Sequence, residues 1–232
     1  GNNSTVPLTD SNDHSSTVAV PTQGLSNTVQ QTASIEPLIA GYDFVFRVLD
    51  YGDLPNSYGT LLASNGARHA ISNALYLGVC VDADLNGQPL ATAAGDDNTA
   101  STQTLNGSAY PVNLPTTTCA DDENGVASAM GRAGSWREGT VTGGMGGALN
   151  ITIGSSTGAT GVPQVFMDFG SGTLTAVTLR TITGTAISTP LATGNYTVYF
   201  DIPAGACPTG QTTDIETRVR LSSTGGLTST GL

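Results

Sequence analysis

The sequence lacks lysine altogether. Its seven basic residues are arginines, and its eighteen acidic residues give a formal net charge of −11 at pH 7. Without lysine the chain cannot form a Lys–Asn isopeptide bond or a Schiff base, and the glycine-rich run from Gly143 to Gly147 cannot act as a P-loop. A surface this acidic is also a poor partner for nucleic-acid phosphates and anionic membranes. We therefore expect no nucleic-acid partner.

Long apolar runs and catalytic signatures are missing as well. No apolar run approaches the ~18 residues that span a bilayer, and no Gly-x-Ser-x-Gly, His-Glu-x-x-His or Cys-x-x-Cys motif occurs. The chain has two histidines. His14 lies in a polar N-terminal segment, and we interpret His69, which precedes a short apolar stretch, as a turn or core residue. We expect a protein that is not an enzyme and has no membrane span.

Cysteine is scarce, with three residues at Cys80, Cys119 and Cys207. Cys80 directly precedes an acidic loop and Cys119 precedes a second acidic segment, so a disulfide between them would hold the two segments together. Closing a loop of ~40 residues would contribute about 4 kcal/mol to stability. We favour the Cys80–Cys119 pairing, while a pair that includes Cys207, or three buried thiols, remain open.

The residues that are abundant favour strands and turns. Glycine is frequent, threonine, serine, valine and asparagine recur, and charged residues make up only 11% of the chain. The first 40 residues are polar and low in aromatics. We interpret 1–40 as an N-terminal extension, either a flexible leader or a strand whose partner lies elsewhere. Residues 41–232 are predicted to form one all-β domain.

Candidate strands in this domain alternate apolar and polar residues and are separated by turns rich in Gly, Ser and Asn. They are Tyr42–Leu49, Ala74–Val81, Ala148–Ile153, Pro163–Asp168, Leu174–Thr183, Asn195–Ile202 and Glu216–Leu221. In the sixth of these, Tyr196, Val198 and Phe200 should share one face. We interpret Thr99–Ala120, which shows little periodicity, as a long insertion. The pattern predicts an antiparallel β-sandwich with long Asp- and Gly-rich loops.

Oxygen-bearing side chains recur in the loop after Cys80. Asp82, Asp84 and Asn86 occupy alternate positions and Gly87 follows, which is the arrangement that a hard cation such as calcium requires. The loop is not an EF-hand, because its twelfth position is Ala93 and the bidentate Glu is missing. We expect the remaining ligands to come from nearby acidic segments. These candidates are Asp96, Asp97, Asp121, Asp122 and Glu123.

Electrostatics also favour a bound cation. Two carboxylates ~4 Å apart, at an effective dielectric constant near 20, repel each other by about 4 kcal/mol. Because the chain has no lysine, a divalent cation is the natural counter-charge, and we expect at least one calcium ion with a dissociation constant of ~10⁻⁴ to 10⁻³ M. The alternatives are acids that extend into water on separate loops, or paired carboxylates for glycoside hydrolysis, which such loops fit less well.

The beginning of the chain is consistent with processing. It starts at Gly1 and not at an initiator methionine, as expected after removal of a secretory signal. We therefore expect a secreted or cell-surface location.

Several short motifs follow one another in the chain. They are Asp50-Tyr51-Gly52-Asp53-Leu54-Pro55-Asn56-Ser57-Tyr58, Ala67-Arg68-His69, Tyr76-Leu77-Gly78, Val81 to Pro89, Gly95-Asp96-Asp97, Asp121 to Val126, Ile202 to Ala206 and Arg218-Val219-Arg220-Leu221-Ser222. In this order they resemble the GEVED domain family of bacterial extracellular β-domains, which occur in large surface and adhesin-like proteins. The resemblance covers about residues 43–232.

Two departures from this family pattern bear on function. An acidic turn expected after Asp168 is reduced to Phe169-Gly170-Ser171-Gly172, and the Gly-Glu-Val-Glu-Asp segment expected after Gly231 is not reached before Leu232. If a last strand is missing from the sandwich, the N-terminal extension of a neighbouring copy would fill the open edge by strand addition. Repeated head to tail, this contact makes a fibre. A fragment of a longer protein would give the same sequence.

The resemblance therefore implies a structural subunit of an extracellular filament or adhesive surface assembly. A carbohydrate- or ligand-binding module of a large adhesin is the alternative. In that case Trp136, the single tryptophan, would stack on a sugar, although packing in the core or an interface is the commoner use of such a residue.

Overall fold

The computed structural model describes residues 49–81, 84, 86–93, 125–206 and 215–232, together with the backbone of 102–105 and 108–111. The chain divides into two units, Gly1–Arg47 and Val48–Leu232, and all described residues belong to the second. The predicted extension 1–40 and most of the predicted strand Tyr42–Leu49 lie outside the described residues.

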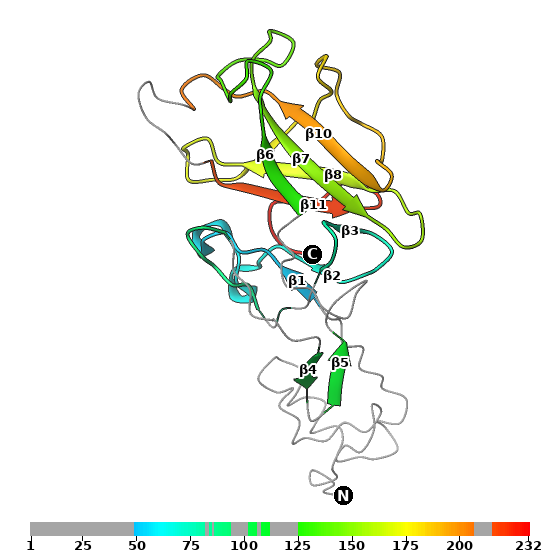
Figure 1. The fold of residues 1–232 in the computed structure, drawn as a ribbon. Coiled ribbons are helices and arrows are strands. Elements are labelled where there is room, and N and C mark those ends of the chain that lie inside the picture. Colours follow the sequence, from blue (N-terminus) through cyan, green and yellow to red (C-terminus); the bar gives the residue numbers. More distant parts are fainter. Residues whose placement is uncertain are drawn as a thin grey trace, which may run out of the picture. The chain divides into compact units, whose positions relative to one another are not determined.

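Two antiparallel sheets form a β-sandwich, as predicted (Figure 1). In the first sheet β7 (Gly147–Gly154) pairs on one side with β10 (Gly194–Phe200). On its other side it pairs with β3 (Tyr76–Leu77) and β6 (Val126–Ala129). The second sheet has the order β11 (Thr217–Ser222), β8 (Val162–Met167), β9 (Thr175–Val177).

The core lies between the two sheets, where the strands present every second side chain. The buried side chains include Leu149, Ile151 and Ile153 of β7, Val165 and Met167 of β8, and Val198 and Phe200 of β10. The predicted faces of β10 are confirmed, because Tyr196 packs against this core while Asn195 and Thr197 are exposed. A period of two is what an antiparallel sheet with one buried face requires.

The predicted insertion Thr99–Ala120 contains a hairpin that its weak periodicity did not indicate. The hairpin consists of β4 (Thr102–Leu105) and β5 (Ser108–Pro111), in which Leu105 pairs with Ser108. The sequence carried a signal for it, because Asn-Gly at positions 106 and 107 is the preferred two-residue connection between such strands.

Two predicted strands are shorter than expected. Ala74–Val81 is reduced to β3, which ends before Gly78, a residue with φ of 77°. Leu174–Thr183 is reduced to β9, after which the chain leaves the second sheet. For β3 the left-handed backbone at Gly78 ends the strand, which the apolar pattern alone does not show.

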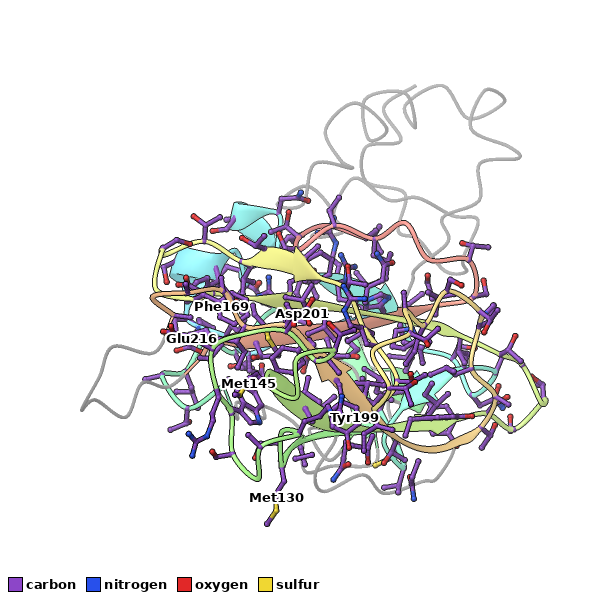
Figure 2. The ribbon with its side chains drawn as sticks, turned by 90° about the horizontal axis from the view of Figure 1, so that it is seen from above. Met130, Met145, Phe169, Tyr199, Asp201 and Glu216 are labelled. Carbon is purple, nitrogen blue, oxygen red and sulfur yellow. The ribbon has the colours of Figure 1, made fainter. Side chains whose placement is uncertain are left out.

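Arg180 closes one side of the sandwich. Its N–H donates to the Tyr199 carbonyl at 2.7 Å, and its carbonyl accepts from the Tyr199 N–H at 2.9 Å. Its guanidinium forms an ion pair with Asp201 at 3.1 Å. Figure 2 labels Asp201 and Tyr199. The segment that follows β9 is therefore joined to the outer edge of β10, so that the two sheets are linked along this side.

A third, mostly irregular layer covers the outer face of β8 and β11. It contains β1 (Leu49–Tyr51) paired with β2 (Arg68–Ala70), and two short 3-10 helices, Asn56–Tyr58 and Leu62–Ser64. The C-terminal residues 223–232 belong to the same layer, because Gln164 of β8 exchanges two hydrogen bonds with the backbone of Leu227. In the view of Figure 1, β1 and β2 lie beneath β11.

Arg220 of β11 holds this layer in place. It is 2% exposed, and its Nε donates to His69 Nε2 at 2.9 Å. The other four N–H groups donate to carbonyls of the layer, at distances of 2.7 to 3.1 Å. These carbonyls belong to Arg68, Thr228, Thr230 and Gly231. All five guanidinium donors are thus used, which offsets the cost of burying the charge.

Arg218, two residues earlier on the same face of β11, makes the neighbouring contacts. Its Nη1 donates to the carbonyls of Tyr58 and Ser229 at 3.0 and 2.6 Å, and its Nη2 donates to Thr60 Oγ1 at 3.3 Å. The two arginines therefore connect β11 to the first 3-10 helix, to β2 and to the C-terminal residues at once.

We predict that Arg220→Met lowers the free energy of unfolding by about 3 to 5 kcal/mol, because it removes all five guanidinium hydrogen bonds between β11 and the third layer. Urea unfolding followed by circular dichroism measures this difference. Arg137→Met is the matched control, since the Arg137 side chain is exposed and bonds only to Ser135, and it should change stability by no more than about 0.5 kcal/mol. Equal effects of the two substitutions would contradict the role given to Arg220.

Candidate functional site

Two of the predicted calcium ligands are described, and both tie the acidic loop to the third layer. Asp84 Oδ2 accepts the Tyr51 N–H at 2.7 Å, and the Asp84 N–H donates to the Leu49 carbonyl at 2.8 Å. Asn86 Oδ1 accepts the N–H groups of Leu62 at 2.8 Å and Gly87 at 3.0 Å. Because both lone pairs of the amide oxygen are then occupied, Asn86 acts here as a tether of the loop.

The other predicted ligands lie outside the described residues. These are Asp82, Asp96, Asp97, Asp121, Asp122 and Glu123. Within the described part of the chain, no group of three or more His, Cys, Asp or Glu residues could hold a metal ion. The calcium site therefore stays a prediction.

Cys80 is buried at the start of this loop, with 4% exposed. Both candidate partners, Cys119 and Cys207, lie outside the described residues, so the Cys80–Cys119 pairing also stays a prediction.

The carboxylate of Asp168, at the start of the reduced acidic turn, receives its hydrogen bonds from other groups of the protein. Its Oδ1 accepts the backbone N–H groups of Gly170, Ser171 and Gly172 at 2.7 to 3.1 Å, and its Oδ2 accepts the Tyr58 hydroxyl at 2.7 Å. Burial alone would raise the pKa of Asp168, but these hydrogen bonds outweigh it and hold the pKa below its ordinary value. Asp168 therefore anchors a turn and joins it to the third layer.

A cavity of about 490 Å³ lies between β6, β11 and the segments of β1, β2 and β3. Most of its walls are apolar or aromatic: Tyr51, Leu54, Leu75, Tyr76, Leu77, Val81, Val126, Trp136, Leu149, Ile215, Val219 and Leu221. Asp50, Asp53, His69, Arg218 and Arg220 supply charged and polar groups. Its size and its largely apolar lining are those of a binding cavity.

The outer edge of β11 borders this cavity and has no strand partner among the described residues. On the inner edge, Asp168 donates its N–H to the Glu216 carbonyl at 2.9 Å. Because backbone groups alternate in direction along an antiparallel strand, the N–H and C=O groups of Thr217, Val219 and Leu221 point away from β8.

The outer edge of β6 borders the cavity from the other sheet. The Thr152 carbonyl of β7 accepts a hydrogen bond from the segment after β3 at 2.9 Å, so the even-numbered residues of β7 face β3 and β6. Ala127, opposite Asn150, therefore bonds to β7, while the backbone groups of Val126 and Ser128 point away from it. In the described part of the chain no strand pairs with this edge. Two unpaired edges thus border one apolar cavity.

Arg218 leaves one donor unused beside the same cavity. Among the described residues, its Nε is the one buried side-chain nitrogen or oxygen without a hydrogen-bond partner, although the residue is only 5% exposed. Gly52, which also lines the cavity, leaves space next to it, because a Cβ placed on Gly52 would lie 3.7 Å from this Nε. A buried, unpaired N–H of a charged group is costly, so an acceptor at this position would be stabilising.

Trp136 packs against the core, the commoner of its two predicted uses. Its ring meets Phe200 edge to face, with centroids 5.0 Å apart, and its Nε1 donates to the Ala129 carbonyl at 2.7 Å. The ring also lines the cavity. The fluorescence of the single tryptophan should therefore respond when the cavity is filled.

His69 is a partly buried residue of β2 whose Nε2 accepts a hydrogen bond from Arg220. An imidazolium has no lone pair for this bond. Burial, reinforced by the positive charge of Arg220, accordingly lowers the pKa of His69 to about 4. We interpreted His69 as a turn or core residue, and it lies partly buried in a strand. Its partner was not predicted, because Arg220 is far away along the chain.

We predict that His69 makes the protein less stable in mild acid. Its folded-state pKa lies below the ordinary value of 6.5, so only the unfolded chain binds the proton as the pH falls from 6.5 to about 4. Stability should decrease over this window by up to about 3 kcal/mol. His69→Gln, which keeps an acceptor for Arg220, should lose this part of the pH dependence in urea titrations at pH 7 and pH 4.5. His14→Gln serves as the control, and equal pH dependence in all three proteins would disprove the assignment.

No helix in the described part of the chain is long and apolar enough to cross a membrane. Comparisons of the chain with protein-family models, with curated proteins and with solved structures found no match. The function therefore has to be argued from the geometry of this site and from the sequence.

Proposed function

We propose that this chain is a structural subunit of an extracellular filament or adhesive surface assembly, joined by exchange of its N-terminal strand. The supporting observation is a pair of strand edges, those of β6 and β11, which no other described strand pairs with and which lie on either side of an apolar cavity. Unpaired edges next to exposed apolar side chains are where an additional strand binds most readily, because it gains main-chain hydrogen bonds and buries its own apolar residues.

The partner in this proposal is another copy of the same chain. The extension 1–40 of one copy fills the edge of the next, and this head-to-tail contact between unlike surfaces continues into a fibre. The resemblance to the GEVED family of surface and adhesin-like proteins supports the same reading. A surface or carbohydrate ligand at the end of such an assembly is compatible with it.

A structural role also agrees with how the charged groups at the cavity are used. Arg220 has all five donors engaged by the protein, and His69 serves as its acceptor. Both residues therefore hold layers together, and neither is positioned to transfer a proton. We propose on this basis that the chain is not an enzyme.

Calcium is proposed to fix the loops that precede β6. The candidate ligands are Asp82, Asp84, Asp96, Asp97, Asp121, Asp122 and Glu123, with Asn86 as a tether. The net charge of −11 and the absence of lysine leave these carboxylates short of counter-charge. A Cys80–Cys119 disulfide would bring the two acidic segments together, and disulfides persist in the oxidising environment outside the cell.

We predict that removal of residues 1–40 converts the filaments of the full chain into single subunits, because the donor strand is lost. Negative-stain electron microscopy and analytical ultracentrifugation distinguish the two states. A thermal melt of the shortened chain shows whether the sandwich still folds. Filaments of unchanged length from a folded, shortened chain would contradict strand exchange by this segment.

We predict that calcium raises the melting temperature. At 10 mM calcium and a dissociation constant of ~1 mM, binding to the folded state adds about 1.4 kcal/mol, or roughly 3 to 6 °C for a chain of this size. Differential scanning fluorimetry with calcium or with a chelator measures the shift. Asp121→Asn together with Asp122→Asn should reduce it, while Asp10→Asn should not. Identical melts with calcium and chelator would rule the site out.

A further inference from the structure

We propose that the inserted strand is Ser16–Val20 of a second copy, and that it enters between β6 and β11 with Val18 and Val20 facing the cavity. This inference rests on the proposed function and adds to it the donor residues and the acceptor edges.

The acceptor requires a short strand with one apolar face. The edge offered by β6 is four residues long, and the cavity next to it is lined by Leu75, Leu77 and Leu149. An incoming strand must therefore place apolar side chains at alternate positions toward the core and small or polar ones away from it. It must also contain no proline at positions that bond to the two edges.

Ser16–Val20 meets these requirements within the extension 1–40. Val18 and Val20 are the one pair of β-branched apolar residues two positions apart in this segment, with the small Ala19 between them. Pro21 follows directly, where it would end the strand. The other stretch with strand character, Asn27–Gln30, offers a single apolar residue, Val29.

The length of the extension agrees with this assignment. Residues 21–48 separate Val20 from β1 and can reach up to roughly 90 Å when extended, which is enough to pass from one subunit to the next. The cavity lining carries Asp50 and Asp53 as well as the buried Arg218 and Arg220, and Ser16–Val20 has no charged residue. The contact therefore depends on apolar burial and main-chain hydrogen bonds.

The unused donor of Arg218 also favours an occupant that carries hydrogen-bond acceptors. Its Nε lies buried at the cavity without a partner. A peptide strand presents a carbonyl oxygen at every residue, so insertion provides an acceptor for this N–H and for the outward N–H groups of Val219 and Leu221.

The opposite side of the sandwich is the competing acceptor. A groove of about 580 Å³ runs between β10 and the loop of residues 181–191, but Arg180 already bonds to both backbone groups of Tyr199 on that edge. The β6–β11 opening instead presents two edges without a partner among the described strands, and it reaches core residues such as Leu149 and Leu221. We therefore assign the strand to the β6–β11 opening.

The test combines two variants of the full chain, each unable to make one half of the contact. Val18→Asp with Val20→Asp disables the donor. Ser128→Pro with Val219→Pro blocks the acceptor, because each proline removes an N–H that points away from the existing ladder and leaves the pairing with β7 or β8 intact. Thr197→Pro is the matched control on β10, where the N–H also points away from β7.

In analytical ultracentrifugation the donor variant and the acceptor variant should each be a single subunit. An equal mixture of the two should form dimers and nothing longer. The control Thr197→Pro should still form filaments. Filaments from either variant alone would overturn the assignment, and so would loss of filaments in Thr197→Pro only. Either result would contradict the proposed donor and acceptor but not the proposal that the chain forms filaments. A mixture that stays monomeric would also overturn it, because the intact donor of one variant would then fail to bind the intact acceptor of the other.

A second measurement tests the opening independently of filament formation and of the acceptor variant. A synthetic peptide of residues 14–22 is titrated into the full chain that carries the donor substitutions, and the fluorescence of Trp136 is followed. A saturable change, abolished by Val18→Asp with Val20→Asp in the peptide, supports the assignment even if the native chain forms no filaments. No change up to millimolar peptide would refute it.

Discussion

The burial of two arginines on one strand is the constraint on which the rest of the structure depends. Arg218 and Arg220 stand on the outer face of β11, where a charge without partners would be prohibitively costly. Their donors meet carbonyls from the first 3-10 helix, β2 and the C-terminal residues, which are distant from one another in the sequence. The hydrogen bonds of the two arginines therefore hold the irregular layer against the second sheet. In this layer they take the place of the main-chain hydrogen bonds that hold paired strands together.

The same layer gives the two sides of the sandwich different properties. On one side Arg180 joins the segment after β9 to β10, so both sheets are linked. On the other side β6 and β11 face a cavity whose third wall is the layer itself. A closed side and an open side on one domain produce the asymmetry that head-to-tail assembly needs, because donor and acceptor are then different surfaces.

Much of the sandwich could be predicted from alternation of apolar and polar residues. The strands at Ala148–Ile153, Pro163–Asp168, Asn195–Ile202 and Glu216–Leu221 were found to within two residues at each end, because one buried face imposes a period of two. The hairpin of β4 and β5 was missed although Asn-Gly marks its turn. Its flanking residues are mostly polar, and a weak apolar pattern hid a strong turn signal.

By itself the sequence determined the class of the fold, the strands of its core and the acidic character of the loops, since these follow from local alternation and composition. Only the tertiary structure decided the role of the Arg218–Arg220 pair, the contact between Arg220 and His69, and the open side between β6 and β11. These features join residues up to 160 positions apart, as in the bond from Arg218 to the Tyr58 carbonyl. The local pattern of apolar and polar residues does not predict such contacts, because they depend on how the sheets and the third layer pack against one another.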